Sequence, residues 1–352
     1  MSFYSNLVRK YSFLKYNISP FRPTMLWRHT LARLASLFAG KKGYRIIDLA
    51  LTYECNLFCQ HCSAKVLNKE GARTLTLDDY REIAKEAKKL DVLSWNITGG
   101  EPLMVPWLYD LIPILEPKIH YISVQTNCMI LDLKTAVRLA KLGVNCITTS
   151  IDSIEPDEHN SFRGHQDSYQ RAFEGVKNAR QAGMQVLIAG TVTHDNLRSK
   201  QLTDLIEKAN KVGAIFLFNL AIPCGNWKGK KDNLLRGDDR AYLDKILEKY
   251  PKTSTDHEVG RNAIGCPSGI EKCYITPFGD VIPCPFIHVS FGNVTEEPLT
   301  GIVKRMQENQ YFGQYQKICI AAEDTVFQDT IMEKIGNLQK KGPVDHKEIY
   351  GA

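Results

Sequence analysis

The 352-residue sequence contains no run of apolar residues near the eighteen that a membrane-spanning helix needs, which argues against an integral membrane protein. It also contains no internal repeat and no low-complexity tract, which argues against a solenoid and against a disordered chain. Ten cysteines are too few for a disulfide-dense scaffold of this length. Hydrophobic residues make up 43% of the chain and charged residues 24%, so we expect a globular protein. Its length is compatible with one large α/β domain plus an appendage.

Excess positive charge is confined to the first fifty residues. The chain carries a net charge of +6, of which residues 1–50 contribute +8 and the rest of the chain −2, so the body is not expected to bind nucleic acid. Residues 24–40 place Trp27, Leu31 and Phe38 at helical spacing, with basic residues on the other faces. Two interpretations stay open for this basic amphipathic helix. It packs on the rest of the protein, which is the commoner outcome, or it lies on an anionic membrane surface.

The same segment makes a poor secretory signal, because Arg28, His29 and Arg33 interrupt its apolar residues. The cysteines are clustered, with three in residues 55–62 and three in residues 266–284. Clustered thiols in a chain without a secretory signal are typical of reduced metal ligands in the cytoplasm. We therefore expect a cytoplasmic protein whose membrane contact, if it has one, is peripheral and on the inner face.

Two kinds of periodicity alternate through the middle of the chain. Runs rich in β-branched and aromatic residues predict six strands, at 46–52, 93–98, 120–126, 145–151, 185–193 and 214–220. Helical patterns lie between them, at 76–90, 133–142, 168–182 and 198–212. This alternation predicts a parallel sheet with right-handed crossovers. Six β/α units are too few for a closed eight-stranded barrel and favour an open, partial (β/α)6 TIM-like barrel, with active residues at the carboxyl ends of the strands.

The pattern changes after about residue 250. Residues 266–294 predict two short strands joined by a Phe-Gly-Asp turn and bounded by cysteines, which indicates a β-hairpin held by metal rather than by a core. A helix and a loose polar terminus at 339–352 are expected to follow. The predicted organisation is an N-terminal segment (1–44), a barrel core (45–250), an auxiliary metal domain (251–325) and a C-terminal helix and tail (326–352).

Three cysteines follow the end of the first predicted strand in the order Cys55-x3-Cys59-x2-Cys62. Tetrahedral zinc accepts cysteine-rich sets, but it usually shows paired C-x2-C knuckles with a fourth ligand nearby, and only His61 offers one here. A four-iron cluster with three cysteine ligands leaves one iron open for reaction. The spacing alone favours iron–sulfur over zinc without excluding zinc.

This cysteine motif resembles that of the radical S-adenosylmethionine (radical SAM) enzymes, whose fold is also a partial (β/α)6 barrel. A second motif of the family stands at the end of the second predicted strand, as Thr98-Gly99-Gly100-Glu101-Pro102. Glycines let the backbone approach a ligand closely, and a glutamate carboxylate can hold an ammonium group. The resemblance implies that this motif binds the amino group of SAM.

The resemblance continues along the later strands, over about residues 45–220. It implies that short polar side chains at the strand ends bind the ribose of SAM, that Arg163 pairs with its carboxylate, and that the segment around Thr191 lines the adenine side. Purely structural roles are the alternative: Asp152 could cap a helix, and Arg163 could form an ion pair at the surface. The residues proposed for these contacts are Gln125, Asn127, Ser150, Asp152, Arg163 and Thr191.

A second resemblance covers residues 266–319. Cys266, Gly279 and Cys284 have the spacing that opens the SPASM/twitch extension, which carries auxiliary iron–sulfur clusters. The dense cysteine run of a full SPASM domain is missing, so the chain resembles the shorter twitch form with a second, auxiliary [4Fe-4S] cluster. Cys266, Cys273, Cys284 and Cys319 are the expected ligands, with Cys273 and Cys319 added by count and position. If one of them is not a ligand, an auxiliary iron stays open for substrate; structural zinc is the alternative.

The remaining cysteines are Cys128, Cys146 and Cys224. Cys146 is expected in the core, whereas Cys128 and Cys224 follow strand ends and could face the active site. A thiol there could donate a hydrogen atom to a substrate radical, and Cys224 is the residue we choose for this role; an uninvolved loop thiol is the alternative.

The function implied is reductive cleavage of SAM to methionine and a 5′-deoxyadenosyl radical, which abstracts a hydrogen atom from a substrate that the sequence does not identify. The first functional hypothesis is oxidoreductase or maturase chemistry on a peptide or small molecule. Flavodoxin or ferredoxin is the electron donor that the family implies. Modification of a lipid or sugar at the membrane, such as epimerisation or carbon–carbon coupling, is the second. The third is a non-catalytic zinc or iron–sulfur protein, which would have no need of the Gly-Gly-Glu-Pro motif.

Overall fold

A nine-stranded sheet in the order β7-β6-β5-β4-β3-β2-β1-β8-β9 forms the centre of the computed structural model, which describes residues 27–28, 30–31, 44–255 and 265–351. Neighbouring strands run parallel except for the antiparallel pair β8–β9. The strands are β1 (Ile46–Ala50), β2 (Ser94–Thr98), β3 (Tyr121–Gln125), β4 (Cys146–Ser150), β5 (Gln185–Val192), β6 (Ile215–Leu220), β7 (Thr253–Thr255), β8 (Lys272–Ile275) and β9 (Val281–Ile282).

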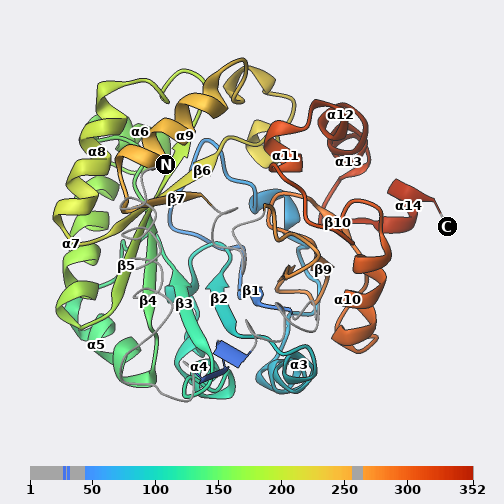
Figure 1. Ribbon diagram of the computed structural model, residues 1–352. Helices are drawn as coiled ribbons and strands as arrows, with labels where there is room; N and C mark the ends of the chain where they lie inside the picture. The colour runs from blue at the N-terminus through green and yellow to red at the C-terminus, as the bar shows by residue number, and fades with distance from the viewer. Residues whose placement is uncertain (1–26, 29, 32–43, 256–264, 352) are drawn as a thin grey trace.

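The helices of the barrel lie along the outer side of this sheet (Figure 1). They are α3 (Leu77–Lys89), α4 (Leu108–Ile114), α5 (Leu133–Leu142), α6 (Pro156–Arg163), α7 (Ser168–Gln181), α8 (Lys200–Lys211) and α9 (Asp239–Lys249). The C-terminal part adds α10 (Leu299–Glu308), α11 (Ile320–Glu323), α12 (Thr325–Phe327), α13 (Glu333–Leu338) and α14 (His346–Tyr350). Helices outside a curved parallel sheet leave its inner side and its carboxyl strand ends for a site.

All six predicted strands and all four predicted helices are present, with ends within two residues of those expected. The capping residues predicted for the first of these helices form the expected hydrogen bonds. The Thr76 side chain accepts a hydrogen bond from the Asp79 N–H, and the Asp79 carboxylate accepts one from the Thr76 N–H at 2.7 Å, which caps α3. Helices α4, α6 and α9 were not predicted. Proline lies inside α4 and opens α6, and both helices are short, so their periodicity is weak.

The prediction that the auxiliary hairpin is held by metal rather than by a core was wrong. Its strands β8 and β9 pair as expected, but β8 also pairs in parallel with β1, so the hairpin extends the barrel sheet. Ile275 and Val281 are fully buried in the main hydrophobic core. Sheet hydrogen bonds and apolar burial therefore hold this hairpin to the barrel.

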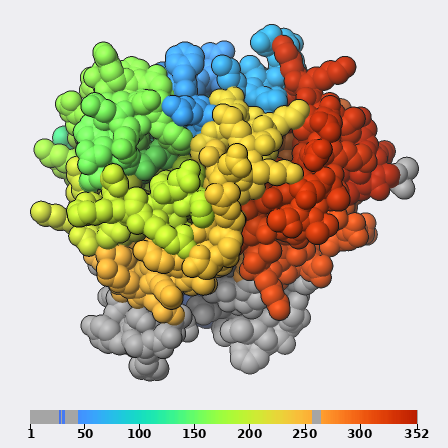
Figure 2. Space-filling model, turned by 90° about the horizontal axis from the view of Figure 1, so that it is seen from above, coloured from blue at the N-terminus to red at the C-terminus, as the bar shows by residue number. Residues whose placement is uncertain are grey.

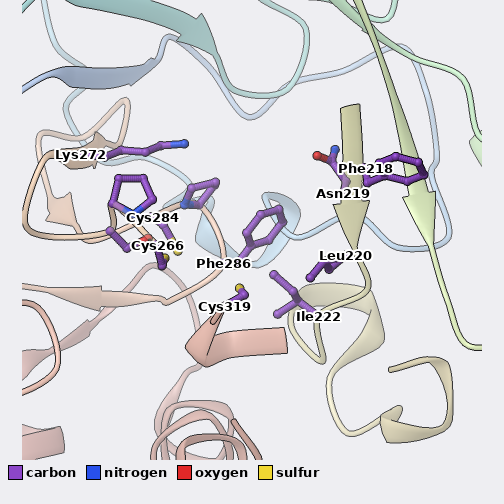
Figure 3. Close-up of a pocket in the computed structure, with 12 residues that line it drawn as sticks. Phe218, Asn219, Leu220, Ile222, Cys266, Lys272, Cys284, Phe286 and Cys319 are labelled. Carbon is purple, nitrogen blue, oxygen red and sulfur yellow. Dashed lines mark hydrogen bonds between the residues drawn. The ribbon is translucent and has the colours of Figure 1, made fainter. Parts of the chain in front are cut away.

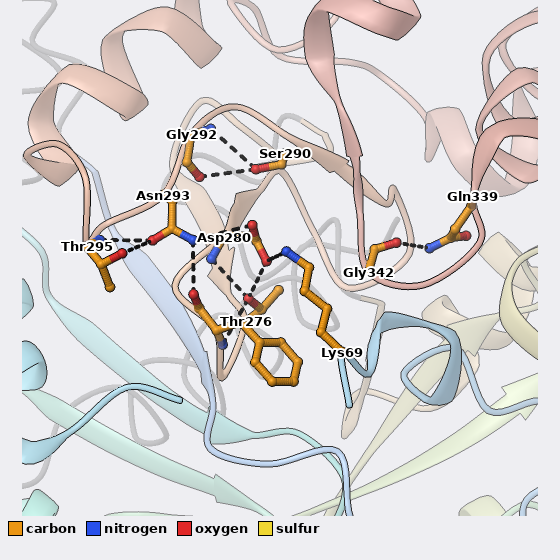
Figure 4. A network of polar contacts seen from close by, with 10 residues as sticks. Lys69, Thr276, Asp280, Ser290, Gly292, Asn293, Thr295, Gln339 and Gly342 are labelled. Atoms are coloured by element: carbon orange, nitrogen blue, oxygen red, sulfur yellow. Dashed lines mark hydrogen bonds and ion pairs between the residues drawn. The ribbon is translucent and has the colours of Figure 1, made fainter. Parts of the chain in front are cut away.

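A polar network also joins the hairpin turn to the segment that follows the cysteine loop (Figure 4). The ammonium group of Lys69 lies 2.7 Å from the carboxylate of Asp280. The same carboxylate accepts a hydrogen bond from the Thr276 hydroxyl, and Asn293 donates to the Phe278 carbonyl oxygen. These contacts fix the auxiliary hairpin relative to the loop that carries the first three cysteines.

The C-terminal residues are more ordered than the loose tail that we predicted. Strand β11 (Val344–Asp345) pairs in parallel with β10 (Val289–Ser290), and α14 follows at once. Val344 and Ile349 are both buried, which accounts for the docking of this segment.

Most of the predicted N-terminal helix, residues 24–40, lies outside the described residues. Within the described part, Arg28 donates hydrogen bonds to the carbonyl oxygens of Val92 and Ile119, so this point of the segment packs on the barrel. Trp27 and Leu31 are 63% and 44% exposed. Across the described ranges, none of the helices combines the length and apolar character required to cross a membrane.

Candidate active site

The loop that carries Cys55, Cys59 and Cys62 begins where β1 ends, and other loops hold it in place. The Phe58 N–H donates to the Arg163 carbonyl oxygen at 3.1 Å. From the loop after β6, Asn226 donates to the carbonyl oxygens of Cys62 and Cys59, at 3.0 and 3.1 Å. The cysteine loop is thus fixed at the carboxyl ends of the strands, as the resemblance predicts.

The surroundings of these thiols fit an iron–sulfur cluster. Burial raises the pKa of Cys55 to about 11, but the Leu57 N–H opposes that rise. The side-chain amide of Asn127 lies 3.6 Å from the Cys55 sulfur, and the Arg163 guanidinium lies 3.7 Å from the Cys59 sulfur. Burial also raises the pKa of Cys59, and the Arg163 charge lowers it. The donors and the positive charge thus partly offset the effect of burial on these sulfurs, and thiolates are the form that binds iron. Among the described residues, no three His, Cys, Asp or Glu side chains lie close enough to hold a single metal ion.

A central cavity of about 270 Å³ opens beside this loop on the inner side of the barrel. It brings together the three cysteines predicted for the first cluster, most of the residues predicted for SAM, and Cys224, from the ends of six strands. Those that line it are Cys55, Cys59, Cys62, Thr98, Gly99, Gly100, Gln125, Asn127, Ser150, Arg163, Thr191 and Cys224. Glu101, Pro102 and Asp152 do not.

The two glycines of the second motif lie against the protein's own backbone. A Cβ atom added at Gly99 would lie 2.3 Å from the Thr52 carbonyl oxygen, and one at Gly100 would lie 2.1 Å from that of Glu54. Gly99 also has a φ of +129°. The close approach that requires glycine here is therefore to the chain leading into the cysteine loop, and it brings the two motifs together.

The prediction that the Glu101 carboxylate holds an ammonium group is not supported by its position. Glu101 is fully buried below the cavity, where its carboxylate accepts hydrogen bonds from the Thr126 hydroxyl and from the N–H groups of Asn127 and Leu103. Burial raises its pKa to about 7, while these three donors lower it. Glu101 therefore positions the end of β3, and Pro102 is buried at the start of the short helix that follows.

Asp152 also lies behind the cavity wall rather than on it, so a contact with ribose hydroxyls is not supported. Its carboxylate accepts from the Arg163 Nε at 2.7 Å and from the Thr191 N–H at 3.0 Å. The Arg163 charge and two nearby histidines hold the pKa of Asp152 well below its usual value, against the effect of burial. Asp152 thus orients two residues that do line the cavity.

A second, smaller cavity of about 40 Å³ contains three of the four predicted auxiliary ligands, Cys266, Cys284 and Cys319 (Figure 3). The Ser268 hydroxyl lies 3.2 Å from the Cys266 sulfur. Burial raises the pKa of Cys284 to about 11, while the Phe286 N–H and the Ser268 hydroxyl lower it. Three thiols at one small cavity, with backbone N–H donors at Cys284 and Cys319, fit a second cluster.

The structure does not place Cys273 with these three. Successive side chains of a strand point to opposite faces, and Lys272 and Tyr274 line the central cavity from β8. Cys273 therefore points to the other face, where it is fully buried beside the Tyr44 hydroxyl. Counting cysteines could not separate it from the ligands, but the period of two along β8 could have done so.

Of the three remaining cysteines, one lines the central cavity and two do not. Cys146 is fully buried in β4. Cys128 packs against α7, where a Cβ at Gly175 would lie 2.4 Å from the Cys128 Cβ, so it does not face the cavity. Cys224 does line the cavity, and burial holds its pKa well above the usual value for a thiol, so it carries its proton.

Sequence reasoning missed Asp48, Lys272 and Trp227 at the cavity, and it considered His61 as a possible fourth metal ligand but not as part of an aromatic cluster. Asp48 and Lys272 form an ion pair of 3.1 Å across β1 and β8. The His61 ring stacks on Phe162 at a centroid distance of 4.5 Å. The centroid of the Trp227 ring lies 5.6 Å from that of His61. Trp227 belongs to the segment after β6 that lies across the upper face, between the barrel and the C-terminal helices (Figure 2). No local motif signals these contacts.

Two family profiles match the chain. One, described as the radical SAM superfamily, covers residues 49–209, and the other, described as an iron–sulfur cluster-binding domain of SPASM type, covers residues 266–323. The first range contains Cys55, Cys59 and Cys62, and the second contains Cys266, Cys284 and Cys319.

Similar proteins carry enzyme names. An AdoMet-dependent heme synthase of Nitratidesulfovibrio vulgaris is 24% identical over 322 residues, which cover 80% of this chain and 87% of that one. The mycofactocin maturase MftC of Mycolicibacterium smegmatis is 28% identical and covers 70% of this chain and 66% of its own. The crystal structure of Streptococcus suis SuiB bound to S-adenosylmethionine shares the fold, with a TM-score of 0.60 at 17% identity over 95% of this chain and 79% of that one. The chain belongs to the radical SAM superfamily of enzymes, with a SAM-binding [4Fe-4S] site in an open TIM-like barrel and a SPASM/twitch-type auxiliary iron–sulfur extension.

Proposed function

We propose that this radical SAM enzyme is an oxidative maturase whose substrate lies between the two cysteine groups. When bound, the clusters and SAM supply the redox chemistry: one electron splits SAM into methionine and a 5′-deoxyadenosyl radical, which takes a hydrogen atom from the substrate. A cluster held by Cys266, Cys284 and Cys319 would accept the second electron as a proton leaves the substrate, so that the hydrogen atom taken by the radical and this electron together make a net two-electron oxidation of the substrate.

The observation that carries this proposal is the wall shared by the two cavities. The same six residues line the central cavity and the smaller three-cysteine cavity: Asn219, Leu220, Ile222, Lys272, Pro285 and Phe286. A substrate held against this wall is near both groups. Because Cys273 is elsewhere, three thiols serve the auxiliary cluster, which leaves one iron without a cysteine ligand.

The chain's own residues bind and orient SAM. In this proposal the Arg163 guanidinium, held by Asp152, takes the SAM carboxylate, and backbone oxygens around Gly99 take its amino group. Gln125, Ser150 and Thr191 take the ribose and adenine side, and Asn127 supports Cys55. The apolar residues around the cavity exclude water from the reacting atoms.

A peptide is the substrate that we propose first, since SuiB has been solved with its precursor peptide and MftC is named a maturase. A tetrapyrrole is the alternative that the heme synthase relatives suggest. A lipid or sugar at the membrane surface, with contact through residues 24–40, is the third. Flavodoxin or ferredoxin is the proposed electron donor.

The test compares two cysteine variants. Anaerobically reconstituted protein is expected to hold about eight irons and to give two EPR signals after reduction, one of which SAM perturbs. Cys284→Ala is expected to lose about four irons and the signal that SAM does not perturb, because Cys284 belongs to the three-thiol group. Cys273→Ala is the matched control, and it should keep both signals. Equal iron loss in the two variants would contradict this ligand set.

Formation of 5′-deoxyadenosine by the unaltered protein tests the SAM chemistry itself. Its absence under dithionite, in protein that holds both clusters, would overturn the proposed function. A single signal unmoved by SAM, or zinc in place of iron, would favour a metal-binding scaffold instead.

A redox-neutral outcome is a second candidate, because the protonated Cys224 thiol lines the central cavity. Here Cys224 would return a hydrogen atom to the substrate radical, and the thiyl radical left on Cys224 would be restored to the thiol by one electron from the auxiliary cluster and one proton from solvent. In D2O the product of the unaltered enzyme would then carry deuterium, and Cys224→Ala would lower its incorporation at least tenfold. Cys146→Ala, which changes a thiol in the core, is the control. Unchanged turnover and labelling in Cys224→Ala would eliminate this role.

A further inference from the structure

A large aromatic side chain is exposed in the loop that carries Cys55, Cys59 and Cys62. Phe58 directly precedes Cys59 and is 73% exposed. The Lys65 ammonium lies 6.0 Å from the centroid of the Phe58 ring. An exposed apolar ring with a cation beside it is typical of a surface that contacts another protein.

Two segments from later in the chain flank this loop. They are residues 225–232 and residues 333–342. The Asn226 side chain donates to the Cys59 carbonyl oxygen at 3.1 Å, and the Lys341 ammonium lies 2.9 Å from the Glu70 carboxylate. Figure 2 shows the three segments, in blue, yellow and red, side by side on the upper face. Together with residues 58–70 the two segments form one surface, the lysine face.

The lysine face is positively charged. It contains eight lysines and three acidic residues, Glu70, Asp232 and Glu333. Asp280 and Asp329, which lie outside it, pair with two of the lysines, so its net charge is +3. The chain from residue 51 onward carries −2, so positive charge is concentrated around the cysteine loop. Such a surface attracts an acidic partner and speeds its association.

The proposed function needs a protein partner at a cluster. The first cleavage of SAM consumes one electron, which a reducing partner supplies. Electron transfer is fastest where the least protein separates donor from acceptor. Phe58 and Cys59 are neighbours in the chain, so a partner that covers the exposed ring of Phe58 lies next to a residue that holds the cluster.

We propose that the lysine face and the Phe58 ring dock an acidic flavodoxin, which reduces the cluster held by Cys55, Cys59 and Cys62. This inference rests on the proposed function, whose electron donor and point of entry it defines. One electron leaves the reduced flavodoxin and enters the cluster, so the flavodoxin is oxidised by one electron. An exposed phenyl ring fits the apolar edge of a flavin, which favours a flavodoxin over other acidic carriers.

The first test measures the binding of a purified acidic flavodoxin, in its oxidised form, to the anaerobically reconstituted full-length enzyme by isothermal titration calorimetry. At about 50 mM salt, where screening is weak, Lys65→Glu/Lys340→Glu is expected to raise Kd about tenfold, because it reverses two exposed charges of the lysine face. Lys317→Glu is the matched control. Lys317 is an exposed lysine two residues before Cys319, beside the auxiliary cysteines, and its reversal should leave Kd unchanged.

The second test compares two reductants in the formation of 5′-deoxyadenosine. With limiting reduced flavodoxin, Lys65→Glu/Lys340→Glu should form it about tenfold more slowly than the unaltered enzyme. Dithionite needs no docking surface, so with dithionite the two proteins should react at the same rate. In the unaltered enzyme, about 500 mM salt should remove most of the flavodoxin-driven rate and leave the dithionite-driven rate.

Three results would overturn docking on the lysine face. They are the absence of measurable flavodoxin binding, an equal Kd in Lys65→Glu/Lys340→Glu and the unaltered enzyme, and a larger loss in Lys317→Glu, which would put electron entry at the auxiliary cysteines. A misfolded double variant would also lose the dithionite-driven rate. The salt dependence of the unaltered enzyme then decides, and a flavodoxin-driven rate that salt does not change overturns the inference.

The proposed function and this inference fail separately. If the unaltered enzyme forms no 5′-deoxyadenosine with dithionite, the proposed function is overturned whatever the flavodoxin titrations give. If dithionite drives the reaction but the lysine face has no effect on flavodoxin, this inference alone is overturned.

Discussion

Replacing Asp152 with asparagine is expected to lower the free energy of unfolding by about 3–5 kcal/mol, the effect of removing one partner of a buried ion pair. The Asp152 carboxylate and the Arg163 guanidinium are both largely buried and lie 2.7 Å apart. Asparagine carries no charge, so the guanidinium would stay in the interior without its counterion. Urea unfolding followed by circular dichroism measures the change.

The same substitution is expected to affect the SAM site. Arg163 contacts the Cys59 sulfur, and Asp152 also fixes the Thr191 N–H. Asp152→Asn should therefore lose SAM-perturbed EPR signal while keeping the auxiliary signal. Asp204→Asn, which breaks an exposed ion pair with Lys200 on α8, is the control and should change neither property. Equal stability of Asp152→Asn and the unaltered protein would contradict the structural role.

Ionisation of Asp152 also has a defined effect on acid stability. Its pKa lies below the usual value in the folded state, so the folded protein binds this proton less readily than the unfolded chain. The ionised Asp152 carboxylate therefore makes its full contribution to the free energy of unfolding above the ordinary aspartate pKa of about 4, and that contribution is lost as the pH falls further. Asp152→Asn should lack this part of the acid sensitivity.

Replacing Glu101 with glutamine is expected to lower the free energy of unfolding by about 2–3 kcal/mol, the size of a hydrogen bond to a charged group that is lost. One carboxylate oxygen of Glu101 accepts from the Asn127 N–H, and the other accepts from Thr126 and Leu103. In either orientation of the glutamine amide, its NH2 group faces at least one of these donors. Weaker retention of the iron near Cys55 should follow, because Asn127 contacts that sulfur.

The pH dependence of this variant provides an independent check. Burial raises the pKa of Glu101 to about 7, so the folded state binds this proton more readily than the unfolded chain. Stability is therefore expected to fall as the pH rises from about 4.5 to 7, by at most about 1.4 kcal/mol per pH unit. Glu101→Gln should flatten this slope, whereas Glu82→Gln, an exposed residue of α3, should not. A slope unchanged by Glu101→Gln would contradict the assignment.

The sequence alone was sufficient for features with a local physical origin. Strand and helix positions follow from periodicity and capping, as Thr76 and Asp79 show. The order Cys55-x3-Cys59-x2-Cys62 and the glycines that follow β2 identified the superfamily, and the strand order brought their residues to one cavity. These features depend on short spacings along the chain or on the rule that parallel strands end at one edge.

Only the tertiary structure decided which polar residues face the cavity and which support it. Glu101 and Asp152 stand in motifs and at strand ends, yet both lie behind the wall because buried donors and Arg163 satisfy them there. The number of cysteines predicts Cys273 as a ligand, but the pairing of β8 with β1 puts its side chain on the face of the sheet away from the cavities. Lys272 and Asp48 are 224 residues apart in the numbering and meet because of the same pairing. Composition and spacing carry no information on contacts between distant segments, which depend on how the whole sheet curves and packs.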